Sequence, residues 1–417
     1  MSQAIALILA LIGVPLFAVM AQSALFGHWS EEIDLQAVII SFYSLAELEF
    51  LDSLPLFAFS GYLLARSNAP QRLLRVSNVL VGWLPGGLAI VTIWVCTLVT
   101  ALTGASGVTI IALGGLLFPA LLKSGYPERF SLGVTTTGGS LGLLFPPSLP
   151  VILFGVVSET PIEDLFVAGI LPGLLILTLL SGYAAFQGGR QNVPRALFSW
   201  RELVSAGRGA IWELPIPILI ALGVYSGKFT VSEAAVIVTT YLLFVEVVIY
   251  RDIQLRQIGS VARESMVLAG GILIILGMTM AVTNYIITVD LPQRLFEWIQ
   301  PYITSKYAFL LALNLFLLLV GCMIDIYAAI ALVVPLILPI AAEYEVDSVH
   351  LGIIFLANMG IGYATPPVGL NLFIASVRFK QPILKIYWSC IPFLMVLLLA
   401  LAAITYFPPL SLWLLSR

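Results

Sequence analysis

Asp325 is an isolated carboxylate inside an apolar stretch, at the end of the small-residue segment Gly321 to Asp325. A charge at the centre of a membrane costs about 2.5 to 3.5 kcal/mol on insertion scales, so a partner should compensate it. A bound Na⁺, a proton or a basic residue would do so, but no Lys or Arg lies nearby in the sequence. We therefore expect Asp325 to belong to a binding site. A purely structural hydrogen bond is the alternative.

Hydroxyl and amide side chains stand at comparable places in the chain. The segment Gly104 to Thr109 carries Ser106 between two glycines, and the amides Asn358 and Asn371 flank a later proline pair. Oxygen atoms of these kinds are ligands that hard cations such as Na⁺ take. Membrane hydroxyls also bond to their own helix, and membrane amides also join neighbouring helices, so both alternatives stay open.

Two long apolar segments, 127–157 and 349–377, are interrupted by glycines and a proline pair. The first has 31 residues, where a straight helix needs roughly 20 to cross the hydrocarbon. Proline removes an N–H donor and blocks helix continuity, so we expect unwound backbone over about 139 to 147 and again before Pro366-Pro367. Unwound backbone at that depth must be buried in protein or line a polar cavity. Its carbonyls then suit a cation, and the half-helix N-termini suit an anion; a simple kink is the alternative.

The chain contains one unit twice. Pro70-Gln71-Arg72-Leu73 recurs as Pro292-Gln293-Arg294-Leu295, and the small-residue segments and the two proline pairs follow each copy in the same order. Corresponding positions stay 216 to 222 residues apart. Duplicated halves with matching Gly/Pro interruptions are typical of secondary transporters that bind their substrate near the bilayer midplane.

The composition, with 60% hydrophobic and 10% charged residues, predicts an all-α polytopic membrane protein. Three cysteines in apolar runs and two histidines at segment ends beside acidic loops offer no transition-metal site. The motifs H-E-x-x-H and G-x-x-x-x-G-K-[ST] do not occur, which argues against an intramembrane metalloenzyme and an ATP-driven pump. We expect no organic cofactor and no nucleic-acid partner, with the lipid bilayer as the surroundings.

Charge placement predicts the topology. Fifteen of the 19 Lys and Arg residues fall in five clusters, which the positive-inside rule places in the cytoplasm, and acidic turns without basic residues fit the other side. Glu213, Glu233 and Glu246 lie near predicted span ends, where we expect them to face interfaces. The N-terminus is then inside. About nine full spans are expected, at 4–27, 51–66, 127–157, 163–187, 211–227, 232–250, 265–288, 349–377 and 386–414.

Two apolar stretches, 78–123 and 296–343, each begin and end on one side, so we expect two re-entrant helical hairpins that enter from opposite faces. The halves are then inverted repeats. The predicted organisation is an N-terminal helix and amphipathic arm at 1–50, repeat 1 at 51–187, connecting scaffold helices at 188–264, repeat 2 at 265–385 and a C-terminal scaffold helix at 386–417.

Motifs spread over more than three hundred residues resemble the large membrane subunit of tripartite ATP-independent periplasmic (TRAP) transporters. They are Gly104-Ala105-Ser106, Gly125-Tyr126, Phe145-Pro146-Pro147-Ser148, Gly169-Ile170-Leu171-Pro172-Gly173, Asn358 to Gly369 and Ile404-Thr405-Tyr406-Phe407-Pro408. The resemblance implies a bacterial inner-membrane importer of a small organic acid. It also implies a small four-helix membrane subunit, a periplasmic substrate-binding protein, and an elevator motion driven by Na⁺.

The same resemblance, together with the residue types above, gives three candidate sites. Sodium site 1 comprises Gly104, Ser106, Thr109, Gly138, Gly139 and Ser140. Sodium site 2 comprises Gly321, Asp325, Asn358, Gly362 and Thr365. The candidate substrate residues are Ser106, Pro146, Asp325 and Pro366. Many relatives have two serines after the first glycine, whereas this chain has Ala105 and then Ser106. The alternative function is a self-sufficient sodium/carboxylate symporter of similar architecture.

Overall fold

The computed structural model describes residues 9, 13–48, 51–191, 193, 198–216, 219, 223 and 228–415. These residues form helices and no β-strand, which confirms the all-α prediction. Within them, seven helices are long and apolar enough to cross a membrane, or eight if the bent pair Glu128–Leu144 and Leu149–Ser158 is one span. The chain is a multi-pass membrane protein. The count of nine spans stays a prediction, because 4–27 and 211–227 lie partly outside the described residues.

The helices of the first half are α2 (Leu16–Ser30), α3 (Gln36–Tyr43), the 3-10 turn η1 (Ser44–Glu47), α4 (Ser53–Arg66), α5 (Ala69–Val81), α6 (Gly87–Thr103), α7 (Ser106–Lys123), α8 (Glu128–Gly138), the 3-10 turn η2 (Leu141–Leu144), α9 (Leu149–Ser158), α10 (Ile162–Ala168) and α11 (Ile170–Arg190). Those that follow are α12 (Trp200–Gly209), α14 (Val231–Phe244) with the π-helical turn η3 (Val245–Ile249), α15 (Leu255–Thr288), α16 (Leu291–Ile299), α17 (Lys306–Met323), α18 (Ile326–Glu343), α19 (Ser348–Gly362), α20 (Leu370–Phe379), α21 (Ile383–Tyr406) and α22 (Pro409–Leu412).

The first hairpin begins later than the sequence predicts. The predicted start at 78 lies inside α5, a separate helix, and the hairpin itself consists of α6 and α7. Pro85 and the left-handed Gly86 (φ 74°) separate the two, since neither residue favours a continuing helix. The hairpin therefore runs from Gly87 to Lys123, with its tip at Gly104 and Ala105.

The second hairpin differs in the same way. The predicted start at 296 falls inside α16, and the hairpin is formed by α17 and α18, joined at Ile324 and Asp325. Ser305 caps α17 by accepting a hydrogen bond from the Ala308 N–H, which fixes the helix start beyond the polar turn. Each hairpin is thus preceded by a short helix, α5 or α16, and each of these carries one copy of the repeated tetrapeptide.

Both predicted interruptions are present. The first separates α8 from α9 and contains the short turn η2; the second separates α19 from α20 over residues 363–369. Each proline pair lies in its interruption and contains a cis peptide bond. The helices beside the breaks form the centre of the molecule, where residues such as Val134 and Leu356 are fully buried. A helix that is buried on all sides lacks a charged face, as α8 does after Arg129 and as α19 does.

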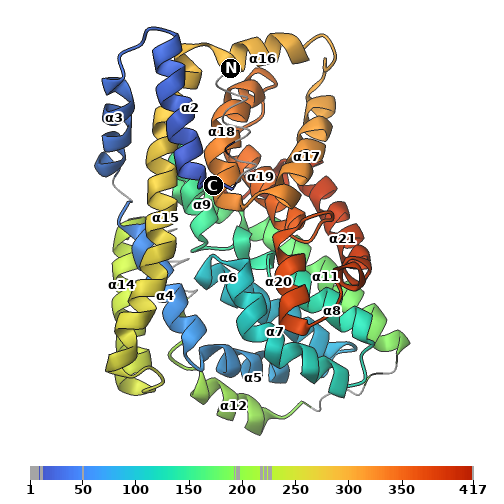
Figure 1. The fold of residues 1–417 in the computed structure, drawn as a ribbon. Coiled ribbons are helices and arrows are strands. Elements are labelled where there is room, and N and C mark those ends of the chain that lie inside the picture. Colours follow the sequence, from blue (N-terminus) through green and yellow to red (C-terminus); the bar gives the residue numbers. More distant parts are fainter. Residues whose placement is uncertain are drawn as a thin grey trace.

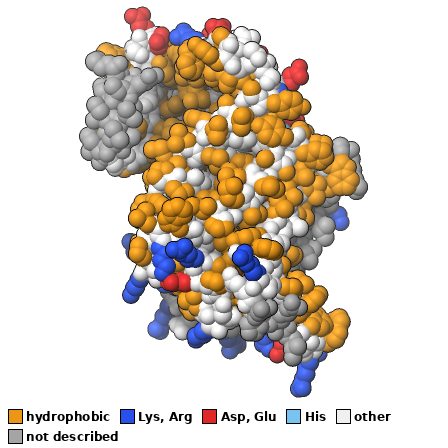
Figure 2. Space-filling model, turned by 90° about the vertical axis from the view of Figure 1, so that its right-hand side faces the viewer, with side chains coloured by type: hydrophobic (Ala, Val, Ile, Leu, Met, Phe, Trp, Pro, Cys, Tyr) orange, Lys and Arg blue, Asp and Glu red, His pale blue; other side chains and the backbone are white. Residues whose placement is uncertain are grey.

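Figure 1 shows how these parts are arranged. Helices α2, α4, α14 and α15 stand along one side of the molecule. The first hairpin lies in the lower half and the second in the upper half, while α5 lies at the lower end and α16 at the upper end (Figure 1). Figure 2 shows a broad hydrophobic band, with most of the visible Lys and Arg below it.

Candidate functional site

The two hairpin tips meet. The Tyr327 hydroxyl, in the first turn of α18, donates a hydrogen bond to the Gly104 carbonyl oxygen over 2.9 Å, and the tyrosine is buried. Gly104 adopts a left-handed conformation (φ 64°), which glycine tolerates and which ends α6 at the tip. Residues 223 positions apart in the sequence therefore share one contact at the centre of the molecule.

The two breaks also meet. The Ser140 hydroxyl donates to the Gly360 carbonyl oxygen over 2.7 Å. Ser140 follows α8 directly, and Gly360 lies in the last turn of α19, so this contact joins the first broken segment to the second. Of the candidate residues of sodium site 1, Ser140 is the one whose hydroxyl bridges the two repeats.

The first tip packs directly on the first break. The Thr100 hydroxyl donates to the Gly139 carbonyl oxygen over 2.8 Å and lies 2.7 Å from the Thr109 hydroxyl oxygen. A Cβ added at Gly139 would lie 3.2 Å from the Ser106 carbonyl oxygen, so the bare backbone of Gly139 allows this approach. Thr109, Gly139 and Ser106 are thus brought together. Thr100 was not predicted; its position one helical turn before Gly104 is the signal that could have identified it.

The second tip packs on the second break at two glycines. A Cβ added at Gly362 would lie 2.6 Å from the carbonyl carbon of Gly321, so no larger residue fits at this contact without a shift. The Gly369 N–H donates to the Cys322 carbonyl oxygen over 2.7 Å and holds the far end of the break to the same tip. Gly321 and Gly362 of sodium site 2 therefore lie side by side.

Asp325 is held by hydrogen bonds and by a helix N-terminus. Its Oδ1 accepts from the Tyr363 hydroxyl over 2.8 Å, and its Oδ2 accepts from the Tyr327 N–H over 3.0 Å, which caps α18. The Ile326 N–H donates to the Tyr363 hydroxyl over 2.7 Å. The carboxylate charge is thus compensated by donors and by the positive end of α18. The structural hydrogen bond that was left open as an alternative is present, and it joins the tip to the second break.

Other hydroxyls near the breaks donate to backbone carbonyls about one turn earlier in the chain. Thr365 donates to the Ile361 carbonyl over 2.9 Å, one turn earlier. The hydroxyls of Thr135, Thr136 and Thr137 likewise donate to carbonyl oxygens three or four residues back in α8. These threonines therefore follow the local pattern that is common for hydroxyls in membrane helices.

Asn358 lies at a helix-helix contact. Its Nδ2 donates to Asn314 Oδ1 on α17 over 2.6 Å and to the Ile354 carbonyl over 2.8 Å. Asn314 in turn donates to the Thr405 hydroxyl over 3.0 Å. Because Asn358 and Gly362 are four residues apart in α19, Asn358 lies one turn before the contact between the second tip and the second break.

Two candidate substrate residues lie away from the tips. Pro146 lines an apolar pocket of about 260 Å³ together with Trp94, Phe145 and Leu174. Pro366 is half-buried in the second break. Ser106 and Asp325 lie at the two tips, so the structure does not gather these four residues in one described pocket.

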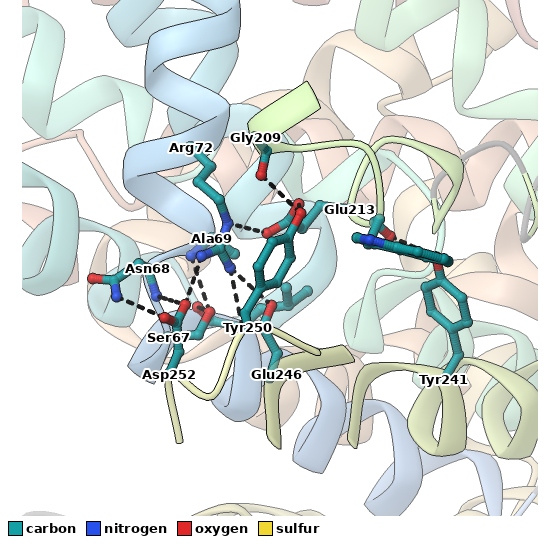
Figure 3. A network of polar contacts seen from close by, with 12 residues as sticks. Ser67, Asn68, Ala69, Arg72, Gly209, Glu213, Tyr241, Glu246, Tyr250 and Asp252 are labelled. Carbon is teal, nitrogen blue, oxygen red and sulfur yellow. Dashed lines mark hydrogen bonds and ion pairs between the residues drawn. The ribbon is translucent and has the colours of Figure 1, made fainter. Parts of the chain in front are cut away.

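A buried ion cluster lies outside this centre (Figure 3). Arg72, from the repeated tetrapeptide on α5, pairs with Glu213, with Asp252 over 2.7 Å and with Glu246 over 3.1 Å. The side chains of Glu213 and Glu246 are 1% and 0% exposed, so the expectation that they face interfaces is wrong. Burial alone would raise the pKa of Asp252, but hydrogen bonds from Asn68 and Arg72 outweigh it and hold that pKa below its usual value. The cluster anchors α5 to the segments beside α12, α14 and α15.

The geometry therefore gathers oxygen atoms at the junction of two hairpin tips and two broken helices. Backbone carbonyls at Gly104, Gly139 and Gly360, the nearby hydroxyls and the Asp325 carboxylate are all ligands suited to a hard cation. No group of three or more His, Cys, Asp and Glu residues able to hold a metal ion occurs in the part of the chain that the structure describes.

Comparisons with known proteins agree with this architecture. Residues 4–410 match the family described as the tripartite ATP-independent periplasmic transporter, DctM component. The chain is 35% identical over 379 residues to the C4-dicarboxylate TRAP transporter large permease protein DctM of Pseudomonas aeruginosa, covering 91% of this chain and 89% of that protein. It is 34% identical over 366 residues to the ectoine/5-hydroxyectoine TRAP transporter large permease protein UehC of Ruegeria pomeroyi, covering 87% and 85%.

A solved structure shows the same fold. The crystal structure of the Alcanivorax borkumensis YdaH transporter superposes with a TM-score of 0.64 at 15% identity, over 90% of this chain and 88% of that chain. At this identity the likeness concerns the fold alone. The family match over residues 4–410 and the 35% identity to a DctM protein establish the family. This chain belongs to the DctM family, the large permease component of TRAP transporters.

Proposed function

We propose that this chain is the translocating subunit of a Na⁺-coupled tripartite transporter of a bacterial inner membrane. It would import a small organic acid that a periplasmic binding protein delivers, in complex with a small four-helix membrane subunit. The observation that carries the proposal is the convergence of the two hairpin tips on the two breaks, through the Tyr327–Gly104 and Ser140–Gly360 hydrogen bonds. Broken helices that meet at one centre are the usual setting of ion and substrate sites in secondary transporters.

Sodium coupling rests on the chemistry of this centre. Sodium site 1 would use oxygens around Ser106, Thr109 and Gly139, which the Thr100 hydrogen bonds bring together. Sodium site 2 would form where Gly321 contacts Gly362, close to the Asp325 carboxylate on the same tip. A dehydrated cation needs several oxygen ligands at once, and unwound backbone supplies carbonyls that a continuous helix would keep in its own hydrogen bonds.

The mechanism would be an elevator motion of the hairpins and broken helices. The helices α2, α4, α14 and α15 stand together along one side and form a candidate scaffold (Figure 1). The first hairpin follows α5 at one end of the molecule and the second follows α16 at the other end, as inverted repeats require (Figure 1). The accumulation of Lys and Arg at the end with α5 supports a cytoplasmic location for that end (Figure 2).

Reconstitution with controlled components tests the function. Proteoliposomes that contain both membrane subunits and the loaded binding protein should take up the acid when an inward Na⁺ gradient is imposed. Uptake that persists unchanged without Na⁺ would refute the coupling. Uptake without the binding protein would instead support a self-sufficient sodium/carboxylate symporter. The first trials should use a C4-dicarboxylate and ectoine, because relatives of this chain carry these substrates in their names.

A further inference from the structure

Buried polar atoms without a partner are concentrated beside the two breaks. Within the described residues, six such side-chain atoms occur, and four belong to Ser148, Asn358 and Asn371. Ser148 directly follows the first proline pair, and Asn358 and Asn371 stand on either side of the second. An unpaired buried polar group costs about 1–3 kcal/mol, so each one calls for an explanation. Their position beside the two breaks suggests that these groups form hydrogen bonds with a bound ligand.

Asn371 is the extreme case. It is fully buried at 0% exposure, and both its Nδ2 and its Oδ1 lack a hydrogen-bond partner. An amide can form up to four hydrogen bonds, and here none is made within the described residues. By contrast, the Nδ2 of Asn358 already donates to Asn314, so that amide has a structural role.

Asn371 lies next to the second break, and its backbone is bonded to Tyr363 in that break. It lies in the first turn of α20, and its N–H donates to the Tyr363 carbonyl over 3.0 Å. The Cα–Cβ bond of a helical residue tilts toward the helix N-terminus, so this side chain leans back toward the second break. The same Tyr363 donates from its hydroxyl to Asp325, which links Asn371 to the second tip.

One turn after Asn371, helix α20 packs beside the first hairpin tip. A Cβ added at Gly107 would be 2.6 Å from Ile374 Cδ1, so Ile374 packs on the bare backbone just after the first tip. Ile374 follows Asn371 by three residues, and residues three apart lie on one side of a helix. Asn371 therefore lies in the same turn of α20 as a residue that packs beside the first tip, next to the second break.

We infer that the Asn371 amide binds the acidic group of the transported solute, donating from Nδ2 to a carboxylate oxygen. The inference rests on the proposed function and names a residue of its substrate site. The inference concerns the Nδ2 donor, which a cation cannot satisfy and a carboxylate oxygen can; the Oδ1 acceptor is then left for a cation or a water. An anionic oxygen is the acceptor that this donor lacks, and a hydrogen bond to a charged group is stronger than one between neutral groups.

Solute-induced stabilisation of the purified membrane complex tests this assignment. The thermal midpoint is measured for the wild type, Asn371→Leu and Asn371→Asp with Na⁺ alone, and then with Na⁺ plus succinate or ectoine. Asn284→Leu is the matched control, since the Asn284 amide already donates to Ser41 over 2.9 Å, away from the breaks. Because losing a hydrogen bond to a charged group weakens binding about tenfold or more, Asn371→Leu should require at least that much more solute for its midpoint shift.

Four outcomes are distinguishable. The inference is supported if Asn371→Leu keeps its Na⁺ response but needs about tenfold more solute, or more, for its midpoint shift. Asn371→Asp should then need still more solute, because its carboxylate repels that of the solute. A solute response equal to that of the wild type overturns it and leaves the amide holding a buried water. A lost Na⁺ response with a retained solute response also overturns it, in favour of an ion ligand. If Asn371→Leu loses both responses, Asn371→Asp decides: a retained Na⁺ response with no solute response supports the inference, and any other result overturns it.

The wild type separates this inference from the proposed function. A wild-type complex that responds to neither solute nor Na⁺, and takes up neither solute with its partners present, contradicts the function itself. A wild type that responds while Asn371→Leu behaves identically contradicts the role of Asn371 alone.

Discussion

The Tyr363 hydroxyl donates to Asp325 Oδ1 over 2.8 Å, so a residue of the second break holds the carboxylate of the second hairpin tip. The same hydroxyl accepts from the Ile326 N–H, the first N–H of α18. Any movement of this tip away from the break must therefore release both hydrogen bonds, which makes the pair a sensitive point for ion binding and for stability.

Asp325→Asn should weaken Na⁺-dependent uptake while the protein still inserts and folds. The amide keeps the shape of the side chain but removes the charge, and hydrogen bonds to charged groups contribute about 1.5–3 kcal/mol. The Na⁺ concentration for half-maximal uptake should rise about tenfold or more. This Na⁺ concentration is measured by titrating the uptake rate against external Na⁺. An unchanged curve would remove Asp325 from the ion site.

Tyr363→Phe should lower the thermal midpoint of the purified protein. It leaves the buried Ile326 N–H without its partner, at a cost of about 1–3 kcal/mol. Tyr302→Phe is the matched control. Tyr302 is exposed, so loss of its hydroxyl should change the thermal midpoint little. Equal midpoints for the two variants would show that the hydroxyl of Tyr363 contributes nothing to the contact.

Gly362→Ala should destabilise the protein and abolish uptake, because the added Cβ would lie 2.6 Å from the Gly321 carbonyl carbon. Overpacking of this kind costs about 1–3 kcal/mol and would displace the second tip. Gly271→Ala in α15 is the contrasting control: no atom lies within 4 Å of its added Cβ, so it should be neutral or stabilise by up to about 1 kcal/mol. Thermal unfolding of both variants decides, and a neutral Gly362→Ala would contradict the close packing.

Arg72→Gln should destabilise by about 3–5 kcal/mol, since it leaves the buried carboxylates of Glu213 and Glu246 without their cation. The repeat supplies its own control. Arg294 occupies the same place in the second tetrapeptide, is exposed, and makes no ion pair with the residues that the structure describes. Arg294→Gln should therefore unfold at nearly the wild-type temperature. Similar losses in both variants would mean that the buried cluster does not anchor α5.

The sequence was sufficient to predict the features that depend on local patterns. The all-α membrane class follows from composition, and both interruptions follow from glycine and proline chemistry. The hairpin starts were predicted too early, because α5 and α16 are themselves partly apolar and continue the hydrophobic signal across Pro85 and Pro301.

Features that depend on distant contacts were not predictable. Thr100 and Tyr327 lie in apolar helices and Tyr363 lies in the second break, and they gain their roles from partners that the fold brings close, such as Gly104, 223 residues from Tyr327. Glu246 was expected at an interface because it lies near a span end, yet Arg72 from a separate helix allows it to be buried. A single sequence shows which groups could do chemistry but not which of them meet.

The central claim is that two oppositely inserted hairpin tips form one centre that opens alternately to the two sides. Cysteine accessibility during turnover tests it most directly, with Ala105→Cys and Met323→Cys in a background that lacks Cys96, Cys322 and Cys390. The account predicts that each position reacts with impermeant reagent from either compartment as the transporter cycles, and that Na⁺ with solute slows both reactions. Labelling of both positions from one and the same compartment throughout turnover would contradict it.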